Sequence, residues 1–334
     1  MTSDPTIDRR AFLAVLALGV LGIRPSAEAQ QAGRVYRLGI LRSTAPPPPD
    51  QRTAPGSIPS ALRELGYVEG QNLVVEERYA EGKLDRLPAR ARELVQLRVD
   101  VIAAVGSAAI LAAKDATTTI PIVMYGGIDP VAAGIVRSLA RPGGNITGVL
   151  ILPGTSLSGK KLELLKEAVP RAVRVALLAP DDPSFGPQMQ EAQKAASALG
   201  IKLVVVEVRG GDYDRAFATI AAERAAALLV GNSPYLTRDR KRIIEFAAKR
   251  RLPAMYEWPE HVEDGGLMSY GSSQKDLVQR IAAQIDRICK GAKPGDLPVE
   301  QPTRFELLIN LKTAKALGLT LPQSLLTRAD RIIE

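Results

Sequence analysis

The sequence predicts an α/β protein with two doubly wound lobes, each built around a parallel β-sheet. Short runs of Val, Ile, Leu and Ala, such as 101–105, alternate with stretches whose apolar residues recur at helical spacing, such as 107–116. Strands that are apolar on both faces are typical of parallel sheets covered by helices on both sides. The alternation pauses near 153–157 and then begins again, so we place the boundary between the lobes there.

The expected elements follow in order along each series. The predicted strands of the first series are 35–41, 73–77, 101–105, 122–125 and 146–150, and its predicted helices are 57–65, 84–97, 107–116 and 131–140. The predicted strands of the second series are 174–178, 203–208, 226–230, 253–256 and 266–269, and its predicted helices are 188–199, 214–223, 237–250 and 274–290. Beyond 293, four prolines surround one predicted strand at 305–311, so we expect this tail to cross between the lobes and not to form a third domain.

Composition and charge exclude several classes of protein. With 334 residues, 46% of them apolar, the chain is too long for one small domain and too apolar for a disordered protein. Lys and Arg outnumber Asp and Glu by 44 to 36, but they are dispersed among acidic neighbours, which favours a solvated surface over a nucleic-acid groove. Cys289 and His261 are the only residues of their kinds, so the sequence excludes an internal disulfide and a cluster of Cys and His metal ligands. We therefore expect no metal, no cofactor and no nucleic-acid partner.

The first thirty residues predict an export signal. Arg9 and Arg10 are followed by an uncharged apolar run over 11–23, and Ala27-Glu28-Ala29 supplies the small-residue pattern that a signal peptidase cleaves. The paired arginines resemble the twin-arginine class of signal. We therefore expect residues 1–29 to be a twin-arginine signal peptide and the mature protein to reach the periplasm, although the segment is also compatible with a retained anchor.

The candidate ligand-binding residues lie where predicted strands end. Open parallel sheets bind ligands at the carboxyl ends of their strands, near helix N-termini that offer free N–H groups. These strand-end loops are 42–44, 106–108 and 126–130 in the first lobe and 181–185, 231–235 and 257–260 in the second. From them we select as ligand-binding residues Ser43, Thr44, Gly106, Ser107, Ala108, Asp129 and Pro130 in the first lobe, and Asp182, Ser184, Phe185, Asn232, Ser233, Tyr235, Glu257 and Trp258 in the second. Several aromatic residues lie in or beside these loops, as expected both for flat surfaces facing a cleft and for rings that cap the core.

No arrangement of residues clearly predicts catalysis. Gly106-Ser107 lacks the second glycine of a nucleophile elbow, and Gly143-Gly144 precedes a strand instead of opening a helix. Asp181-Asp182 is compatible with an acid–base pair, but Asp-Asp-Pro is also an ordinary turn sequence. We therefore expect a binding protein and not an enzyme.

Several motifs along nearly the whole mature chain resemble one family. They are LRELGYVEGQN at 62–72, TIPIV at 119–123, DPV at 129–131, LARPGGNITG at 139–148, GGLMSYG at 265–271, LPVEQPT at 297–303 and the run 305–319. These motifs resemble the ABC-transporter substrate-binding proteins that include tryptophan- and tyrosine-binding lipoproteins. The resemblance implies a type I periplasmic binding fold, in which two lobes joined by a hinge close on a small molecule for an importer's permease and ATPase. It implies a first lobe of 30–152 plus 272–296 and a second lobe of 153–271 plus 297–334, in a protein expected to be a monomer.

The ligand cannot be carried over from the family. The loops 179–183 and 231–234 depart from the Asn-Pro and Asp-Pro patterns of better understood members, and both loops are expected in the cleft. We expect an amino acid or a related carboxylate, with its carboxylate at Ser107 and an ammonium group at Asp129 or Asp182. A sensor or effector-binding domain of the same fold, and an α/β isomerase, remain alternative readings.

Overall fold

The computed structural model describes residues 33–49, 52–54, 56–151 and 157–334. The chain divides into two compact units, Met1–Val35 and Tyr36–Glu334, and every element given below belongs to the second unit. The expected signal peptide, 1–29, lies outside the described residues, as does most of the expected lobe boundary. Within the described part of the chain, no helix combines the length and the apolar character that crossing a membrane requires.

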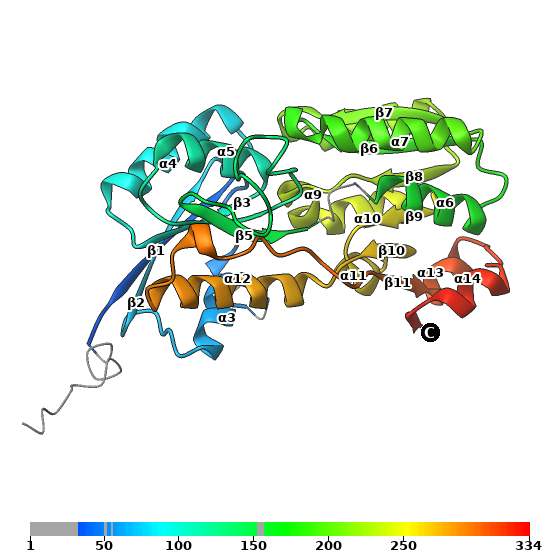
Figure 1. The fold of residues 1–334 in the computed structure, drawn as a ribbon. Helices are drawn as coiled ribbons and strands as arrows, with labels where there is room; N and C mark the ends of the chain where they lie inside the picture. Colours follow the sequence, from blue (N-terminus) through cyan, green and yellow to red (C-terminus); the bar gives the residue numbers. More distant parts are fainter. Residues whose placement is uncertain (1–32, 50–51, 55, 152–156) are drawn as a thin grey trace, which may run out of the picture. The chain divides into compact units, whose positions relative to one another are not determined.

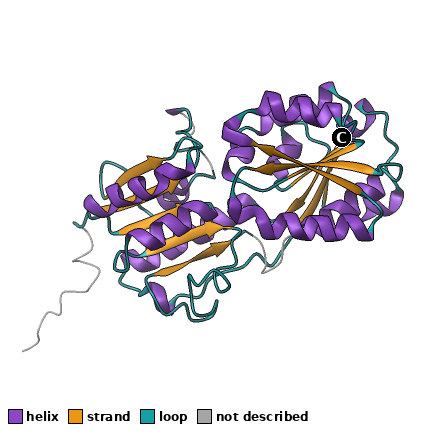
Figure 2. Ribbon diagram, turned by 90° about the horizontal axis from the view of Figure 1, so that it is seen from above, coloured by secondary structure: helices purple, strands orange, loops and turns teal. Residues whose placement is uncertain are grey.

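Five parallel strands form the first sheet, in the order β2-β1-β3-β4-β5 (Figure 1). They are β1 (Tyr36–Arg42), β2 (Leu73–Tyr79), β3 (Val101–Val105), β4 (Ile122–Gly126) and β5 (Ile146–Leu150). The helices of this part are α3 (Ile58–Glu64), α4 (Leu87–Gln96), α5 (Ser107–Ala116) and α12 (Gln274–Cys289), with the short 3-10 helices η2 (Leu84–Arg86) and η5 (Pro294–Asp296). Figure 2 shows helices on both faces of the sheet.

The sequence of β3 explains why helices cover both faces. Val101, Ala103 and Val105 belong to the buried cluster that includes α3 and α12, whereas Ile102 and Ala104 belong to the cluster that includes α4 and α5. Successive side chains of a strand point to opposite faces, so a strand that is apolar at every position needs a cover on each side. The continuous apolar run therefore fixes the layered architecture of this part.

Seven strands form the second sheet, in the order β12-β11-β10-β9-β8-β6-β7. Its neighbouring strands are parallel except for the antiparallel pair β10–β11. The strands are β6 (Arg174–Pro180), β7 (Lys202–Val208), β8 (Ala227–Val230), β9 (Ala254–Tyr256), β10 (Met268–Gly271), β11 (Glu306–Asn310) and β12 (Arg331–Ile333). The helices are α6 (Ser158–Ala168), η3 (Pro183–Phe185), α7 (Gly186–Ala198), η4 (Arg209–Gly211), α8 (Tyr213–Ala222), α9 (Pro234–Arg238), α10 (Arg240–Lys249), α11 (Pro259–Glu263), α13 (Leu311–Ala316) and α14 (Gln323–Arg328).

The chain passes between the two sheets more than once. Helix α12 follows β10 of the second sheet but packs against α3 and β5 of the first, and β11 then returns to the second sheet. Where two of these passages meet, the Ser272 hydroxyl donates to the carbonyl oxygen of Ile151 at 3.5 Å. Val149 and Glu300 form a parallel bridge beside them. The predicted α/β class with two mainly parallel sheets is therefore confirmed.

Two of the predicted helices differ from the structure. The predicted helix 131–140 is wrong, because the segment is a series of turns in which Gly134 has a φ of +61° and the amides of Ile135 and Val136 donate to the carbonyl oxygen of Pro130. The spacing of its apolar residues fits a helix, but a left-handed residue in the middle breaks the helical hydrogen bonds. The predicted helix 237–250 is two helices, α9 and α10, which meet at Asp239.

The prediction also missed α6, α11, α13, α14 and β12. Three of these helices have at most six residues, which is too short for periodicity to detect. The fourth, α6, starts at Leu157 without a side-chain cap, so it lacks the usual start signal.

Candidate functional site

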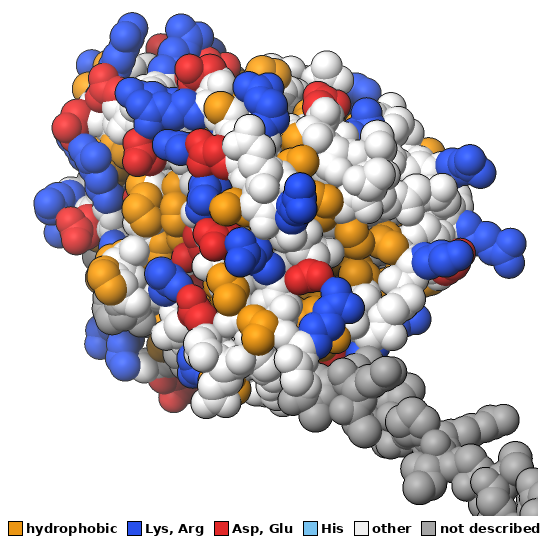
Figure 3. All heavy atoms as spheres, turned by 90° about the vertical axis from the view of Figure 1, so that its left-hand side faces the viewer, with side chains coloured by type: hydrophobic (Ala, Val, Ile, Leu, Met, Phe, Trp, Pro, Cys, Tyr) orange, Lys and Arg blue, Asp and Glu red, His pale blue; other side chains and the backbone are white. Residues whose placement is uncertain are grey.

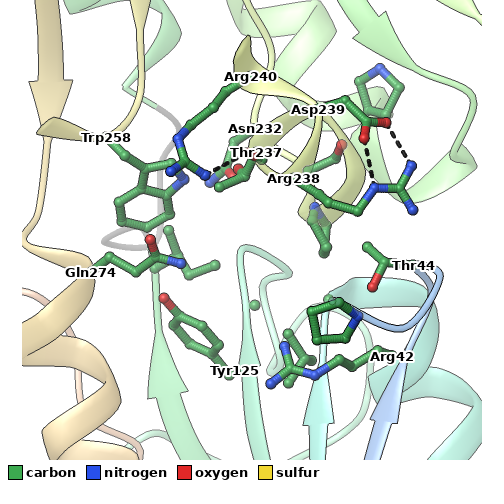
Figure 4. Close-up of a pocket in the computed structure, with 18 of the residues that line it drawn as sticks. Arg42, Thr44, Tyr125, Asn232, Thr237, Arg238, Asp239, Arg240, Trp258 and Gln274 are labelled. Atoms are coloured by element: carbon green, nitrogen blue, oxygen red, sulfur yellow. Dashed lines mark hydrogen bonds and ion pairs between the residues drawn. The ribbon is translucent and has the colours of Figure 1, made fainter. Parts of the chain in front are cut away.

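A pocket of about 900 Å³ lies where strands of both sheets end. Figure 4 shows Arg42 and Tyr125 on one wall, Asn232, Thr237 and Arg240 opposite them, and Trp258 and Gln274 at one side. The volume is within the range of pockets that hold small organic molecules. The pocket therefore lies at the place that the strand ends predicted, and it takes its walls from both parts of the chain.

The first sheet brings a cation and an aromatic ring to the same edge. Arg42 is the last residue of β1, and it pairs in register with Val105 of β3, which in turn pairs with Tyr125 of β4. Residues paired in this way point to the same face of a sheet. The side chains of Arg42 and Tyr125 therefore leave the sheet on one face, two strands apart, and both line the pocket.

Helix α5 begins at the pocket without a side-chain cap. Its N-cap is Gly106, which has a φ of +94° and no side chain to accept from the first turn. Within the part of the chain that the structure describes, the amides of Ser107, Ala108 and Ala109 have no acceptor. Free amides at the start of a helix, together with the helix dipole, favour an anion there.

Gly106 is also the point where the two walls touch. A Cβ built on Gly106 would lie 2.9 Å from Cγ of Pro234, the first residue of α9. Both the positive φ and the close approach exclude other residues at this position. On the opposite wall the Ser233 hydroxyl caps α9 by accepting from the amide of Leu236, so it already has a partner.

Charged side chains around the pocket are mainly basic. The cations that line it are Arg42, Arg52, Arg238, Arg240, Lys241 and Arg242, and the carboxylates are Glu77, Asp182 and Asp239. Most of the guanidinium groups are paired: Arg52 with Glu77 at 3.2 Å, Arg238 with Asp239 at 2.6 Å, Arg240 with Asp264 at 2.7 Å and Arg242 with Asp214 at 2.5 Å. Arg42 differs from them, because no described residue pairs with its guanidinium. The charge balance of the pocket therefore favours an anionic ligand.

Away from the pocket, charges of both signs share the surface. Figure 3 shows Lys and Arg intermingled with Asp and Glu on the face that it displays. Arg78 and Arg90 both pair with Glu93, for example, at 2.8 Å each. Exposed pairs of this kind contribute little to stability, but they divide the basic charge into small areas.

Trp258 belongs to both parts of the molecule. It follows β9 of the second sheet, yet it is only 2% exposed and packs in the cluster of the first sheet with Leu277 and Val278 of α12. The preceding residue, Glu257, forms a buried ion pair with Lys161 of α6. The ring is therefore mostly core, and only part of it faces the pocket.

The residues expected at the site divide into two groups. Those that line the pocket are Thr44, Gly106, Ser107, Asp182, Phe185, Asn232, Ser233 and Trp258. Those that are not part of its lining are Ser43, Ala108, Asp129, Pro130, Tyr235 and Glu257. The side chain of Ser184 lies outside the described part of the chain. Asp129 is exposed, and its carboxylate accepts from the amides of Val131 and Ala132 at 3.0 Å each, so it begins the turn that follows. The pocket thus lacks one of the two carboxylates expected to hold an ammonium group.

The list of expected site residues omitted several that line the pocket. Arg42 ends β1 and belongs to the strand-end loop 42–44, but it was not selected from that loop as a ligand-binding residue. Tyr125 lies one residue before the end of β4 and is found by the same rule. Gln274 opens α12, and its place in the pocket depends on the return of that helix to the first sheet, which no local pattern indicates.

Burial shifts the pKa of several groups near the pocket. Burial, and then the charge of Glu260, raise the pKa of Tyr125, while the nearby Arg42 lowers it. Burial also raises the pKa of the Glu260 carboxyl. Burial, with a smaller contribution from Arg240, lowers the pKa of His261 to about 3, so this imidazole is neutral at physiological pH. Among the described residues no cluster of His, Cys, Asp and Glu has the arrangement of a metal site.

Comparison with solved structures identifies the class of protein. A protein from Vibrio cholerae O1 biovar El Tor is 27% identical, covers 90% of this chain and 100% of its own, and superposes with a TM-score of 0.78. A Streptococcus pneumoniae ABC domain in complex with L-Trp is 24% identical, with coverage of 90% and 100% and a TM-score of 0.76. These likenesses and the two sheets define a type I periplasmic binding fold, as the sequence motifs implied.

The comparisons also identify the family. Residues 49–333 match the model of the ABC transporter substrate binding protein family, and the chain belongs to this family. A tyrosine-binding protein from Clostridioides difficile is 26% identical over 262 residues, which are 78% of this chain and 74% of that protein. Proteins of this family are the substrate-binding proteins of ABC transporters.

Proposed function

We propose that this chain is the solute-binding component of an ABC importer and that its pocket carries a small carboxylate, either an amino acid or a related compound. The observation that carries the proposal is the pocket, which has the volume of a small organic molecule, a guanidinium (Arg42) that pairs with no described residue, and a helix N-terminus without a side-chain cap. The relative from C. difficile is named as tyrosine-binding, and the structure from S. pneumoniae holds L-Trp. Both compounds combine a carboxylate with a ring, which supports a ligand of related chemistry.

In this proposal the lobes are 30–152 plus 272–296 and 153–271 plus 297–334, and they close as a single-chain hinge. The contact of Gly106 with Pro234 and the shared pocket lining support it, because each wall contributes groups that a ligand would touch. A ligand that touches both walls favours the closed state by the affinity that it gains there. A permease and an ATPase would then receive the solute from the closed monomer.

The test of this function is the identity of the molecule that the protein carries. The protein is purified without denaturation from its own cells and weighed by native mass spectrometry, and uptake of the released compound is measured in cells with and without the gene. We expect one small carboxylate bound, no chemical change in it during incubation, and loss of uptake in the deletion strain. Conversion of the compound would instead support the isomerase reading, and normal uptake in the deletion strain would contradict the importer role.

Export is the second part of the proposal. The paired arginines at the start of the chain support the twin-arginine route to the periplasm. Replacement of both Arg9 and Arg10 by Lys is expected to leave the precursor in the cytoplasm, as fractionation and immunoblotting would show. A matched control carries Lys in place of Arg24, which lies after the apolar run. Normal maturation of the Arg9→Lys, Arg10→Lys variant would contradict this route.

A further inference from the structure

Within the proposed binding function, the charges of the pocket discriminate between kinds of carboxylate. Two of the three lining carboxylates are already paired inside the pocket, since Glu77 contacts Arg52 and Asp239 contacts Arg238. The third, Asp182, also interacts with other groups of the chain. An ammonium group that entered this pocket would therefore compete with existing partners for every carboxylate.

The opposite holds for a negative group. Arg42 is half-buried at the end of β1, and none of the described residues accepts a hydrogen bond from its guanidinium or pairs with it. A guanidinium presents its donors in a planar fork that matches a carboxylate, so a half-buried one without a partner is a ready site for that group. Such a pair adds a charge-assisted contact without breaking an existing one.

A second observation points to the same place. Tyr125 is 6% exposed and lines the pocket on the same face of the sheet as Arg42. Its hydroxyl makes no hydrogen bond of good geometry with a described residue, although the Gln274 amide is close enough to lower its pKa. Figure 4 shows this hydroxyl directed toward the side of the pocket where Gln274 and Trp258 lie. A buried polar group without a partner is unfavourable unless a ligand or water satisfies it. The α5 amides that have no acceptor among the described residues follow β3, the strand between β1 and β4, so Arg42, Tyr125 and the start of α5 border the pocket from three neighbouring strand ends.

We propose that the ligand is a carboxylate attached to a flat apolar body and without an α-ammonium group, and that Arg42 is the counter-ion of its carboxylate. The rings of Tyr125, Phe185 and Trp258 line the pocket and supply a surface for the apolar body. The proposal rests on the proposed function, but it selects one of the two ligand classes that function leaves open. It also separates this chain from relatives whose names and complexes contain amino acids.

Three probes with the same ring test the proposal: 3-(4-hydroxyphenyl)propionate, L-tyrosine and tyramine. Binding to the purified mature protein is measured by titration calorimetry. The first probe is expected to bind at least tenfold more tightly than L-tyrosine, and tyramine more weakly than both. Arg42→Gln should weaken the first probe at least tenfold, the loss typical of a charge-assisted pair. Arg63→Gln, which removes an exposed arginine of α3 outside the pocket, is the charge-matched control and should change affinity less than twofold.

The stability of the variant separates a binding role from a structural one. Because no described residue pairs with the Arg42 guanidinium, Arg42→Gln should leave the Tm of the ligand-free protein unchanged, whereas a structural arginine would lower it. The proposal would be overturned if L-tyrosine bound as tightly as 3-(4-hydroxyphenyl)propionate or more tightly. It would also be overturned if Lys241→Gln weakened binding of 3-(4-hydroxyphenyl)propionate more than Arg42→Gln does. Failure of all three probes to bind would overturn it as well, while a co-purified solute that is taken up would leave the proposed function standing.

Discussion

Replacement of His261 by Phe is expected to change how the stability of the protein depends on pH. The imidazole is 2% exposed in α11, and burial lowers its pKa to about 3 from 6.5. An unfolded chain exposes the same histidine, which there binds a proton below pH 6.5. Because the folded imidazole stays neutral down to about pH 3, the unfolded state gains protons first as the pH falls. The contribution of His261 is therefore complete above pH 6.5 and is lost progressively between 6.5 and 3.

The two pKa values set the size of the effect. Each pH unit between them costs about 1.4 kcal/mol, so acidification from pH 6.5 to pH 4.5 should remove roughly 2 to 3 kcal/mol of unfolding free energy. Glu260 acts in the opposite direction, because its pKa is raised by burial and the folded state therefore holds its proton more tightly. The positive charges of Arg240 and Lys161 add to the lowering of the imidazole pKa.

The assay compares urea unfolding of the wild type and His261→Phe at several pH values between 7 and 4.5, followed by circular dichroism. Phe keeps the ring contact with Tyr256, whose centroid lies 5.1 Å from that of the imidazole, but it cannot take up a proton. The difference between the two proteins should grow with acidity in favour of the variant, while the contribution of Glu260 cancels. If the unfolding free energies of the two proteins differ by the same amount at every pH from 7 to 4.5, the buried imidazole does not have the lowered pKa that its burial requires.

Three further substitutions test the core and one residue that the sequence placed at the site. Lys161→Met leaves Glu257 buried without its partner and should lower the free energy of unfolding in urea by about 3 kcal/mol or more. Adding Glu257→Gln to this variant should restore much of the loss. If the single and the double variant lose the same free energy, the buried ion pair is contradicted. Gly148→Ala places a Cβ on the backbone of Met124 at a φ of +148° and should cost about 3 kcal/mol or more, visible as a lower Tm. Asp129→Ala removes the acceptor of two turn amides and should cost about 1 kcal/mol while affinity for the probes stays the same, so a loss of affinity would return Asp129 to the site.

Much of the fold could be predicted because it depends on local patterns. Apolar strands and glycine stops are local signals, and the predicted strands agree with the structure to within two residues at each end, for example at β2 and β6. The missed helices and the false helix at 131–140 lack such signals or carry misleading ones. A residue such as Gly134 adopts its left-handed conformation because of the turn around it, and the spacing of its apolar neighbours contains no trace of that turn.

The site was less predictable than the fold, because its residues meet only through long-range pairing. The rule that ligands bind at strand ends selected Thr44, Ser107 and Asn232, which all line the pocket. The same rule also selected Asp129, which does not line the pocket. The strand end there begins a turn, and the carboxylate accepts a hydrogen bond from an amide of that turn. No rule of this kind distinguishes a side chain that is already paired from one that is free. The property that most directs the choice of ligand is that the Arg42 guanidinium pairs with no described residue, and it is seen only when the neighbours of Arg42 in the fold are known.

Trp258 both packs in the core of the first sheet and lines the pocket. Its place after a strand of the second sheet predicts a ligand-facing loop, yet its ring completes the core beneath the first sheet. The buried pair of Lys161 and Glu257 holds the residue before it, so the ring is fixed by one sheet and packed against the other. A movement of one lobe against the other must then either carry the indole along with its packing or break that packing. Breaking it would expose a large buried ring at a cost of a few kcal/mol. If the lobes close as proposed, the motion is therefore expected to pivot about Trp258, so that the indole keeps its packing against α12.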